Sequence, residues 1–274
     1  MEKSKERLQV IEKIKAFEKE GNFNEDVETD GVAKTIKPKD VDYVNKKLKS
    51  KFLTKLANFL GYSFFELMTK KKRLIIKEVH GLDNARLISG GAIITCNHFS
   101  IKDNYVVYKS LKPALKKRQK IWKVIKESNY TNFKGPVRLM MRHANTLPLS
   151  SSMETMKHFS RAVSALLSRG EKILIYPEQA MWWNYKKPRP LVSGAFKIAV
   201  KNNVPILPTF ITMKDTNLID KDGFPVQEYF VYFLPPIYPN KTLGFSENVK
   251  ILMDNNYNAW VNVYETFYSE KLVY

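Results

Sequence analysis

His98 and Asp103 lie five residues apart in the stretch NHFSIKDN, and as a pair they could move a proton. A neutral histidine, whose ordinary pKa is about 6.5, can take a proton from a hydroxyl at physiological pH. A carboxylate bonded to the other ring nitrogen fixes the tautomer and stabilises the imidazolium that forms. With an electrophile that is already activated, such as a thioester, this pair alone could catalyse acyl transfer to an alcohol.

Cys96 offers a different chemistry, because on a strand it would face the same side as His98. A Cys–His pair would attack through the thiolate. Cys96 stands inside an apolar run, however, where a free cysteine usually acts as a small core residue. It is also the only cysteine, which excludes an intramolecular disulfide and a cysteine-rich metal site. The sequence therefore favours the His–Asp pair and predicts no metal.

Neither regular structure would bring His98 and Asp103 together. A five-residue step turns a helix by about 500° and leaves the side chains about 140° apart, and on a strand it places them on opposite faces. A strand that ends at Asn97, a turn, and a helix that begins near Ser100 would allow contact. The carboxyl end of a strand is also where α/β folds commonly bind ligands. The alternative is a surface histidine and a helix aspartate that do not touch.

Short runs rich in β-branched and aromatic residues alternate with helical segments from residue 74 onward. This alternation predicts an α/β fold with a mixed, mostly parallel central sheet flanked by helices. The predicted strands cover residues 74–79, 92–96, 122–125, 173–176, 206–211 and 229–234.

Four helices are predicted from apolar spacing and capping residues. They cover residues 8–20, 52–73, 151–168 and 246–268. Ser151 and Glu154 would form a capping box at the start of the third helix. Residues 21–40 are polar and would form a linker or a loosely held arm. The predicted organisation is a charged helix and linker, an amphipathic segment and one large domain, over residues 1–50, 51–73 and 74–274.

The net charge of +19 belongs almost wholly to the body of the protein, because residues 1–50 carry a net charge of only +1. Such an excess favours an anionic partner, which could be a membrane surface, nucleic acid or an acidic carrier protein, or it could serve only solubility. No zinc-ligand spacing or basic repeat accompanies it, so we expect no specific nucleic-acid partner. The charged N-terminus does not resemble a signal peptide.

The segment FLTKLANFLGYSFFELMTKKKR, residues 52–73, has apolar residues at near-helical spacing and four basic residues at its end. It could be one helix or two short helices broken near Gly61. It could lie on a membrane surface with aromatic anchors and a basic rim, or pack on the core as an ordinary helix. The first alternative would make the chain a peripheral or monotopic protein on the cytoplasmic face of a membrane.

Three blocks of the sequence resemble, in the same order, those of glycerolipid acyltransferases of the 1-acylglycerol-3-phosphate acyltransferase type. NHFSIKD resembles the N-H-x4-D block, ILIYPEQ (173–179) resembles an apolar strand ending in Pro-Glu-Gly, and SGAFKIAVKNNVPILPTFI (193–211) resembles the closing block. The resemblance covers about residues 74–215. It implies an enzyme of phospholipid synthesis that moves a fatty acyl group to the hydroxyl of a glycerol phosphate or a lysophospholipid. The donor would be a thioester of coenzyme A or of acyl carrier protein, and no further cofactor is expected.

The family pattern implies a role for each matching residue. His98 would be the general base that activates the acceptor hydroxyl, and Asp103 would orient it. Glu178 would help to bind the polar head of the acceptor. The other pocket residues would be Asn97, Gln179, Pro205 and Pro208.

Two departures from the family pattern concern the acceptor. Gln179 stands where the family has glycine, and NTLPLSSS (145–152) lacks the arginine that the family uses on the acceptor phosphate. The loop QAMWWNYKKPRPL, which follows Glu178, carries three cations.

We expect Arg189, whose planar fork suits a phosphate, to replace the missing arginine, with Lys186 or Lys187 assisting. Trp182 and its aromatic neighbours in this loop would line the acyl entrance or lie in the lipid interface. An exposed basic loop that only attracts a membrane is the alternative.

Two other classes of function stay open. The chain could be a catalytically silent relative that binds lipid or an acidic carrier protein, although His98 and Asp103 are both intact. It could also be a basic nucleic-acid-binding protein. Consumption of a thioester would separate the enzyme from both.

Overall fold

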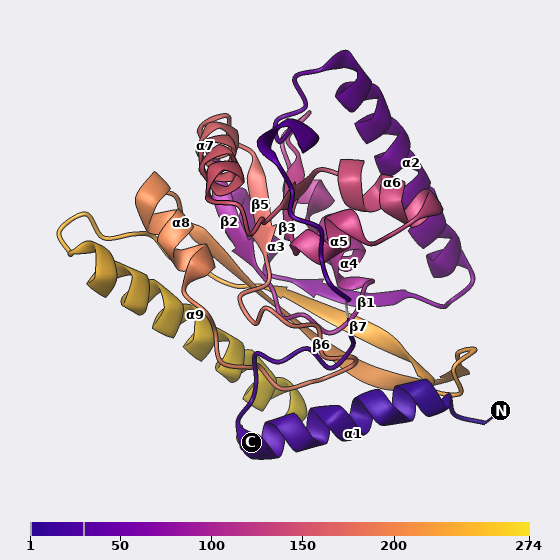
Figure 1. Cartoon of the computed structure of the whole chain (residues 1–274). Helices are drawn as coiled ribbons and strands as arrows, with labels where there is room; N and C mark the ends of the chain where they lie inside the picture. Colours follow the sequence, from indigo (N-terminus) through magenta and orange to yellow (C-terminus); the bar gives the residue numbers. More distant parts are fainter. Residues whose placement is uncertain (1, 30) are drawn as a thin grey trace.

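A seven-stranded sheet forms the centre of the computed structural model, which describes residues 2–29 and 31–274 (Figure 1). The strand order is β1-β7-β6-β2-β5-β3-β4, and every neighbouring pair is parallel except β6 and β7. The predicted α/β class with a mixed, mostly parallel sheet is therefore confirmed. The strands are β1 (Ile75–His80), β2 (Ala92–Thr95), β3 (Ile121–Ile125), β4 (Thr146–Pro148), β5 (Lys172–Ile175), β6 (Ile206–Ile219) and β7 (Pro225–Phe233).

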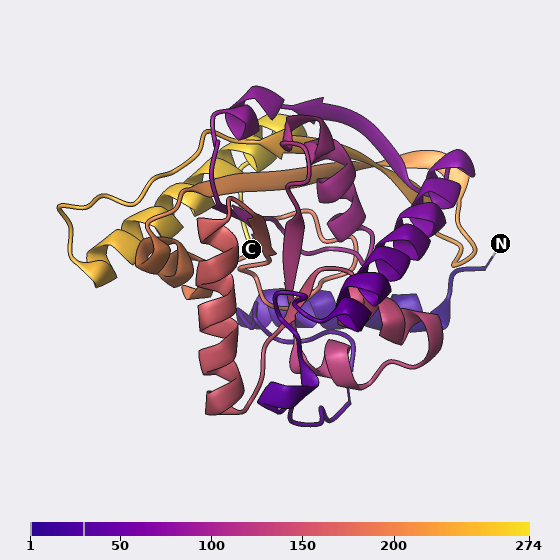
Figure 2. The same ribbon diagram turned by 90° about the horizontal axis from the view of Figure 1, so that it is seen from above.

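Helices cover both faces of the sheet because the central strands are apolar on both sides, as parallel strands usually are (Figure 2). On β2, Ile94 and Cys96 face a cluster shared with α2, α3 and α4, whereas Ile93 faces α7, α8 and α9. The helices are α1 (Lys5–Glu20), α2 (Leu48–Lys70), α3 (Leu82–Arg86), α4 (Asp103–Leu111), α5 (Glu127–Thr131), α6 (Gly135–His143), α7 (Met153–Ser168), α8 (Gly194–Asn202) and α9 (Phe245–Tyr268).

Several element boundaries differ from the sequence prediction for local reasons. β2 ends at Thr95, one residue before the end of the strand predicted over residues 92–96. α7 is capped by Ser152, whose hydroxyl accepts from a main-chain N–H, so the predicted cap at Ser151 is wrong. β4 is not predicted because three residues carry little pattern, and β6 runs on to Ile219 because its hairpin with β7 extends beyond the other strands.

The N-terminal arm packs against the large domain instead of hanging loosely from it. α1 ends at Gly21, as predicted, and α1 and Val27 join a buried cluster around Trp182. Ile36 is buried, and its main chain is held at both ends: its N–H donates to Glu127 and its carbonyl accepts from Thr155. Residues 21–29 and 31–40 thus belong to the packed structure.

α2 has two apolar sides. It continues through Gly61 without a break, and its inner side packs on the core through Tyr62, Phe65 and Met68. Gly61 lies against α6, where an added Cβ would be 3.4 Å from the sulfur of Met140. The outer side presents large apolar residues to solvent, namely Leu48, Phe52, Phe59, Leu60, Phe64 and Leu67. We call these six residues the outer stripe of α2.

Two lysines lie within the sheet without a carboxylate partner among the described residues. Lys172 donates to the carbonyls of Ile88 and Gly90 at 3.1 and 2.6 Å. Lys123 on β3 has no such bond in the described part of the chain, and burial lowers its pKa to about 8. A lysine of this kind destabilises the folded state while it stays charged.

We expect Lys123→Met to raise the free energy of unfolding by roughly 1–3 kcal/mol at neutral pH, since one pKa unit corresponds to about 1.4 kcal/mol. The pKa is lowered on folding, so the unfolded chain holds the proton more tightly. The penalty is therefore complete below the folded pKa of about 8 and disappears as pH rises toward the unfolded value of about 10.4. Urea unfolding at several pH values measures the difference, which should shrink between pH 8 and 10. An unchanged gap across that window, or a gap of the same size for Lys250→Met on the exposed side of α9, would contradict this account.

Candidate functional site

The side chains of His98 and Asp103 meet at the carboxyl end of β2. His98 lies in the loop after the strand, and Asp103 is the first residue of α4. The distance from His98 Nδ1 to Asp103 Oδ2 is 2.6 Å. Asp103 is fully buried, whereas the His98 side chain keeps 19 % of its surface exposed. The strand, turn and helix predicted from the sequence bring the pair together, although α4 begins three residues later than expected.

Tyr176, one residue past the end of β5, completes the environment of this pair. Its hydroxyl donates to Asp103 Oδ1 at 2.8 Å, and its ring stacks on the His98 imidazole with centroids 4.1 Å apart. Burial and the charge of Asp103 raise the pKa of Tyr176, so the phenol stays a donor. Both carboxylate oxygens of Asp103 are therefore fixed by neighbours. The sequence prediction misses Tyr176, and its place next to Pro177 at a strand end beside β2 is the signal that could have found it.

Glu178 holds the main chain of the site and does not face a substrate. One oxygen accepts from the His98 N–H at 2.9 Å, and the other accepts from the Arg189 N–H at 2.9 Å. The side chain is 2 % exposed and also pairs with the Arg189 guanidinium at 3.0 Å. Both oxygens already accept hydrogen bonds and the side chain is buried, so nothing in this structure supports the predicted contact of Glu178 with the acceptor head.

Arg189 is the clearest correction to the sequence prediction. It is 1 % exposed, and its guanidinium donates to the carbonyls of Phe23 and Ala180 as well as to Glu178. It also lies over the Trp182 ring, 4.6 Å from the centroid. A buried cation whose donors are already used cannot serve an acceptor phosphate. Arg189 thus neutralises Glu178 and fastens the N-terminal arm.

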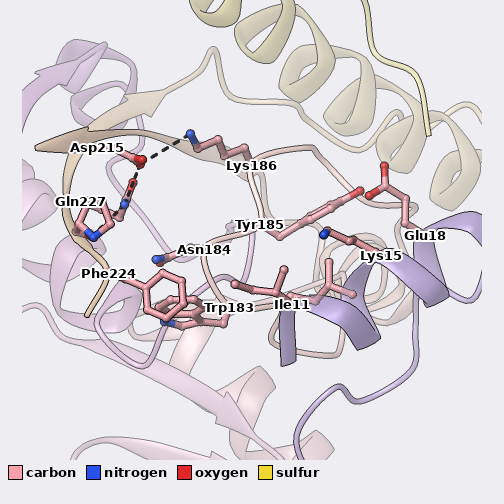
Figure 3. Close-up of a pocket in the computed structure, with 12 residues that line it drawn as sticks. Ile11, Lys15, Glu18, Trp183, Asn184, Tyr185, Lys186, Asp215, Phe224 and Gln227 are labelled. Carbon is pink, nitrogen blue, oxygen red and sulfur yellow. Dashed lines mark hydrogen bonds and ion pairs between the residues drawn. The ribbon is translucent and has the colours of Figure 1, made fainter. Parts of the chain in front are cut away.

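The two lysines of the same loop have carboxylate partners of their own. A cavity of about 350 Å³ lies between α1 and the β6–β7 hairpin, and Figure 3 shows Lys186 in its wall. Lys186 lies 3.9 Å from Asp215, and Lys187 pairs with Glu18 of α1. Assistance of these lysines at the acceptor site stays a prediction.

The aromatic residues of the loop form the contact between α1 and the domain. Trp182 is fully buried among α1 residues and donates its indole N–H to the Glu25 carbonyl at 2.9 Å. Trp183 lies in the wall of the same cavity in Figure 3, edge-on to the ring of Phe224. Trp182 therefore lies under α1, and neither at an acyl entrance nor in a lipid interface.

The other predicted pocket residues have structural positions. Asn97 accepts from the Ile211 N–H and donates to the Ile211 carbonyl, at 2.9 and 3.0 Å, and so ties the His98 loop to β6. Gln179 is exposed and has φ of +63°, which explains why glycine suits this position in the family.

The two prolines of the closing block lie at different levels of the sheet. Pro208 pairs with Thr95 near the end of β2. Pro205 lies level with Ala92 at the start of β2, so its predicted place at the back of the pocket is wrong.

Cys96 has no chemistry to offer in this structure. It is fully buried, and burial together with the nearby charges of Asp103 and Glu178 raises the pKa of its thiol. The reactive thiolate is therefore suppressed. This favours the His–Asp pair over a thiol nucleophile.

Comparison with known proteins identifies the family of the chain. The profile of the family described as Acyltransferase matches residues 77–212, which contain His98, Asp103, Tyr176 and Glu178. The chain belongs to the acyltransferase family. This confirms the membership that the three sequence blocks predict, and it makes the protein an acyltransferase.

The fold of this acyltransferase is also found in a solved structure. It is similar to the 1-acyl-sn-glycerophosphate (LPA) acyltransferase PlsC from Thermotoga maritima, with a TM-score of 0.52 and 18 % sequence identity. The match covers 84 % of this chain and 87 % of that chain. No curated protein matches the acyltransferase in sequence.

Tyr176→Phe tests whether the hydroxyl on Asp103 positions the histidine. The variant keeps the stacked ring, and we expect kcat for acyl transfer to fall roughly tenfold, because a hydrogen bond to a charged group contributes about 1.5–3 kcal/mol. Tyr232→Phe is the matched control, since Tyr232 stacks on His80 with centroids 4.6 Å apart, outside the catalytic loop. Steady-state kinetics and a melting curve of both variants give the comparison. Equal activity of the two would remove Tyr176 from the catalytic assembly.

Proposed function

We propose that this acyltransferase moves a fatty acyl group from an acyl thioester to the hydroxyl of a glycerol phosphate or a lysophospholipid. The observation that carries the proposal is the bond between His98 Nδ1 and Asp103. It leaves the second imidazole nitrogen, Nε2, for the acceptor, on a side chain that is still partly exposed.

In the proposed mechanism, Nε2 of His98 removes the proton of the acceptor hydroxyl while the oxygen attacks the thioester carbonyl. The imidazolium that forms is stabilised by the buried carboxylate of Asp103. The proton then passes to the departing thiolate, which leaves as the free thiol. Folding already gives the site this geometry, because Tyr176 holds Asp103 and Glu178 holds the His98 main chain.

The donor would be coenzyme A or acyl carrier protein carrying the acyl group, with no additional cofactor. A net charge of +19 favours both, since both are anionic. The glycerol phosphate class of acceptor rests on the resemblance of the three sequence blocks and on the name of the structurally similar PlsC. A catalytically silent relative that only binds lipid or carrier protein is the second candidate.

His98→Ala should lower the rate of thioester consumption roughly 10²–10⁴-fold, the usual contribution of a general base. Asp103→Asn should fall in the same range, because an amide favours the wrong tautomer of His98. Cys96→Ser should keep most of the activity. Free thiol released from an acyl thioester, with a lysophospholipid as acceptor, is the quantity to measure.

The matched outcomes separate the candidates. Inactive wild-type protein with every thioester and acceptor of these classes would favour the silent relative. An inactive Cys96→Ser beside an active His98→Ala would restore the thiol mechanism.

We further propose that α2 holds the enzyme on the cytoplasmic face of an anionic membrane. None of the helices in the described residues is long and apolar enough to cross a bilayer. The outer stripe of α2 and the exposed basic residues at positions 70–73 instead match an interfacial helix.

Replacing the four basic residues at positions 70–73 with Gln should release the protein from anionic vesicles, since each contributes about 1 kcal/mol near such a surface. Replacing Phe52 and Phe59 with Ser should weaken binding to neutral and anionic vesicles alike. Sedimentation with vesicles at low and high salt measures both effects.

The control exchanges four exposed lysines on the opposite side of the sheet, Lys157, Lys197, Lys241 and Lys250. It carries the same change of net charge and should sediment like the wild type. If it is released as readily as the variant of positions 70–73, membrane binding follows net charge and not α2.

A further inference from the structure

A second cavity, of about 320 Å³, lies at the other end of the parallel strands from His98. Trp122 and Thr146, which line it, stand at the starts of β3 and β4. The start of β3 is level with the start of β2, because Ile121 and Ala92 both pair with Lys172. His98 follows the opposite end of β2, so this cavity is separate from the catalytic group. We call it the α2 cavity, since the first turn of α2 forms one wall.

The α2 cavity is strongly basic. Its lining includes the basic side chains of Lys39, Lys47, Lys49, Arg142 and His143. None of these five forms an ion pair within the described part of the chain. Burial, together with the charges of Arg142 and Lys49, lowers the pKa of His143.

The two carboxylates of the lining are used locally. Asp42 accepts from the main-chain N–H groups of Lys46 and Lys47, at 3.0 and 2.8 Å, and Asp40 accepts from that of Lys37 at 3.0 Å. They stabilise the turn that leads into α2. The Lys47 charge also acts on Asp42, whereas neither carboxylate forms an ion pair with Lys39, Lys49, Arg142 or His143 among the described residues.

An unpaired donor lies deep in the same wall. Trp122 is 3 % exposed, and its indole N–H has no hydrogen-bond partner among the described residues. A buried N–H of this kind is costly unless an acceptor reaches it. An acceptor oxygen of a guest that reached this N–H would satisfy it.

Arg142 is positioned to bind such a guest. Its Nε donates to the Tyr130 carbonyl at 3.1 Å, and the guanidinium lies over the Tyr130 ring, 4.8 Å from the centroid. Its two terminal nitrogens have no partner in the residues that the structure describes. The start of α2 already has a carboxylate, since Asp42 accepts from the main-chain N–H groups of Lys46 and Lys47, so Arg142 is the group that a guest would meet.

We propose that the α2 cavity binds a phosphate-bearing anion, either the head group of an anionic lipid or a free phosphate. A held guanidinium and the neighbouring basic side chains together suit a compact anion with several acceptor oxygens. The same first turns of α2 begin the outer stripe, with Leu48 82 % and Phe52 66 % exposed. A lipid whose phosphate enters the cavity would thus have its chains beside the apolar side of α2.

Titration calorimetry of the full chain with inorganic phosphate measures binding to this site directly. Arg142→Gln should raise the dissociation constant roughly tenfold or more, the size expected for charge-assisted bonds. Trp122→Phe should weaken binding by a smaller factor, since it removes only the N–H. Arg138→Gln is the matched control, because Arg138 lies one turn earlier on α6, is exposed and does not line the cavity.

Vesicles of phosphatidylcholine with and without phosphatidylglycerol separate the two sources of phosphate. Weaker binding of Arg142→Gln, but not of Arg138→Gln, to the anionic vesicles supports a lipid head group. Unchanged vesicle binding together with weaker binding of inorganic phosphate supports a free phosphate. Wild-type protein that binds neither form, or equal losses in the two arginine variants with unchanged melting temperatures, would overturn the proposal.

Discussion

The buried carboxylate of Glu178 is the interaction on which the catalytic loop depends. It joins the main chain of His98 to the main chain and guanidinium of Arg189. A buried charge is tolerated only when its partners are complete, and removal of one partner commonly costs about 3–5 kcal/mol. The guanidinium in turn reaches the Phe23 carbonyl, so the same network fixes the N-terminal arm. Glu178 of the family motif therefore serves as the internal anchor of the site.

The carboxylate of Asp103, which contacts the His98 imidazole, is likewise held by its neighbours. One oxygen faces His98, the other faces the Tyr176 hydroxyl, and the Ser100 N–H adds a weaker contact at 3.4 Å. The carboxylate cannot turn away without breaking all three. Pre-organisation of this kind would let His98, in the proposed mechanism, act as a base without rearrangement of its surroundings during the reaction.

Local sequence patterns predict much of this arrangement. The apolar run before His98 and the polar residues after it are enough to predict a strand, a turn and a helix that join His98 to Asp103. Parallel strand ends also place ILIYPEQ near the pair, because β5 neighbours β2. The contact of Tyr176 with Asp103 is different, since it depends on the relative height of two strands that only the assembled sheet defines.

The sequence alone does not show which side chains of this loop are buried. Arg189 stands in YKKPRPL, a stretch whose composition is typical of an exposed loop, yet it is buried because Glu178 and three carbonyls accept its donors. Trp182 is hidden by α1, a helix more than 150 residues earlier in the chain. Neither contact leaves a mark on periodicity or spacing. These long-range partners, and not the local elements, account for the wrong assignments.

The stacking of Tyr176 on His98 has a consequence for selectivity. With one ring face covered and Nδ1 engaged by Asp103, the imidazole has little freedom to swing toward a substrate. Under the proposed mechanism, the acceptor would have to carry its hydroxyl to a fixed point. For an acceptor with several hydroxyls of similar acidity, the way the molecule binds, and not its intrinsic reactivity, would then decide which hydroxyl is acylated. The regiochemistry of the proposed reaction would thus depend on the stacked pair of His98 and Tyr176.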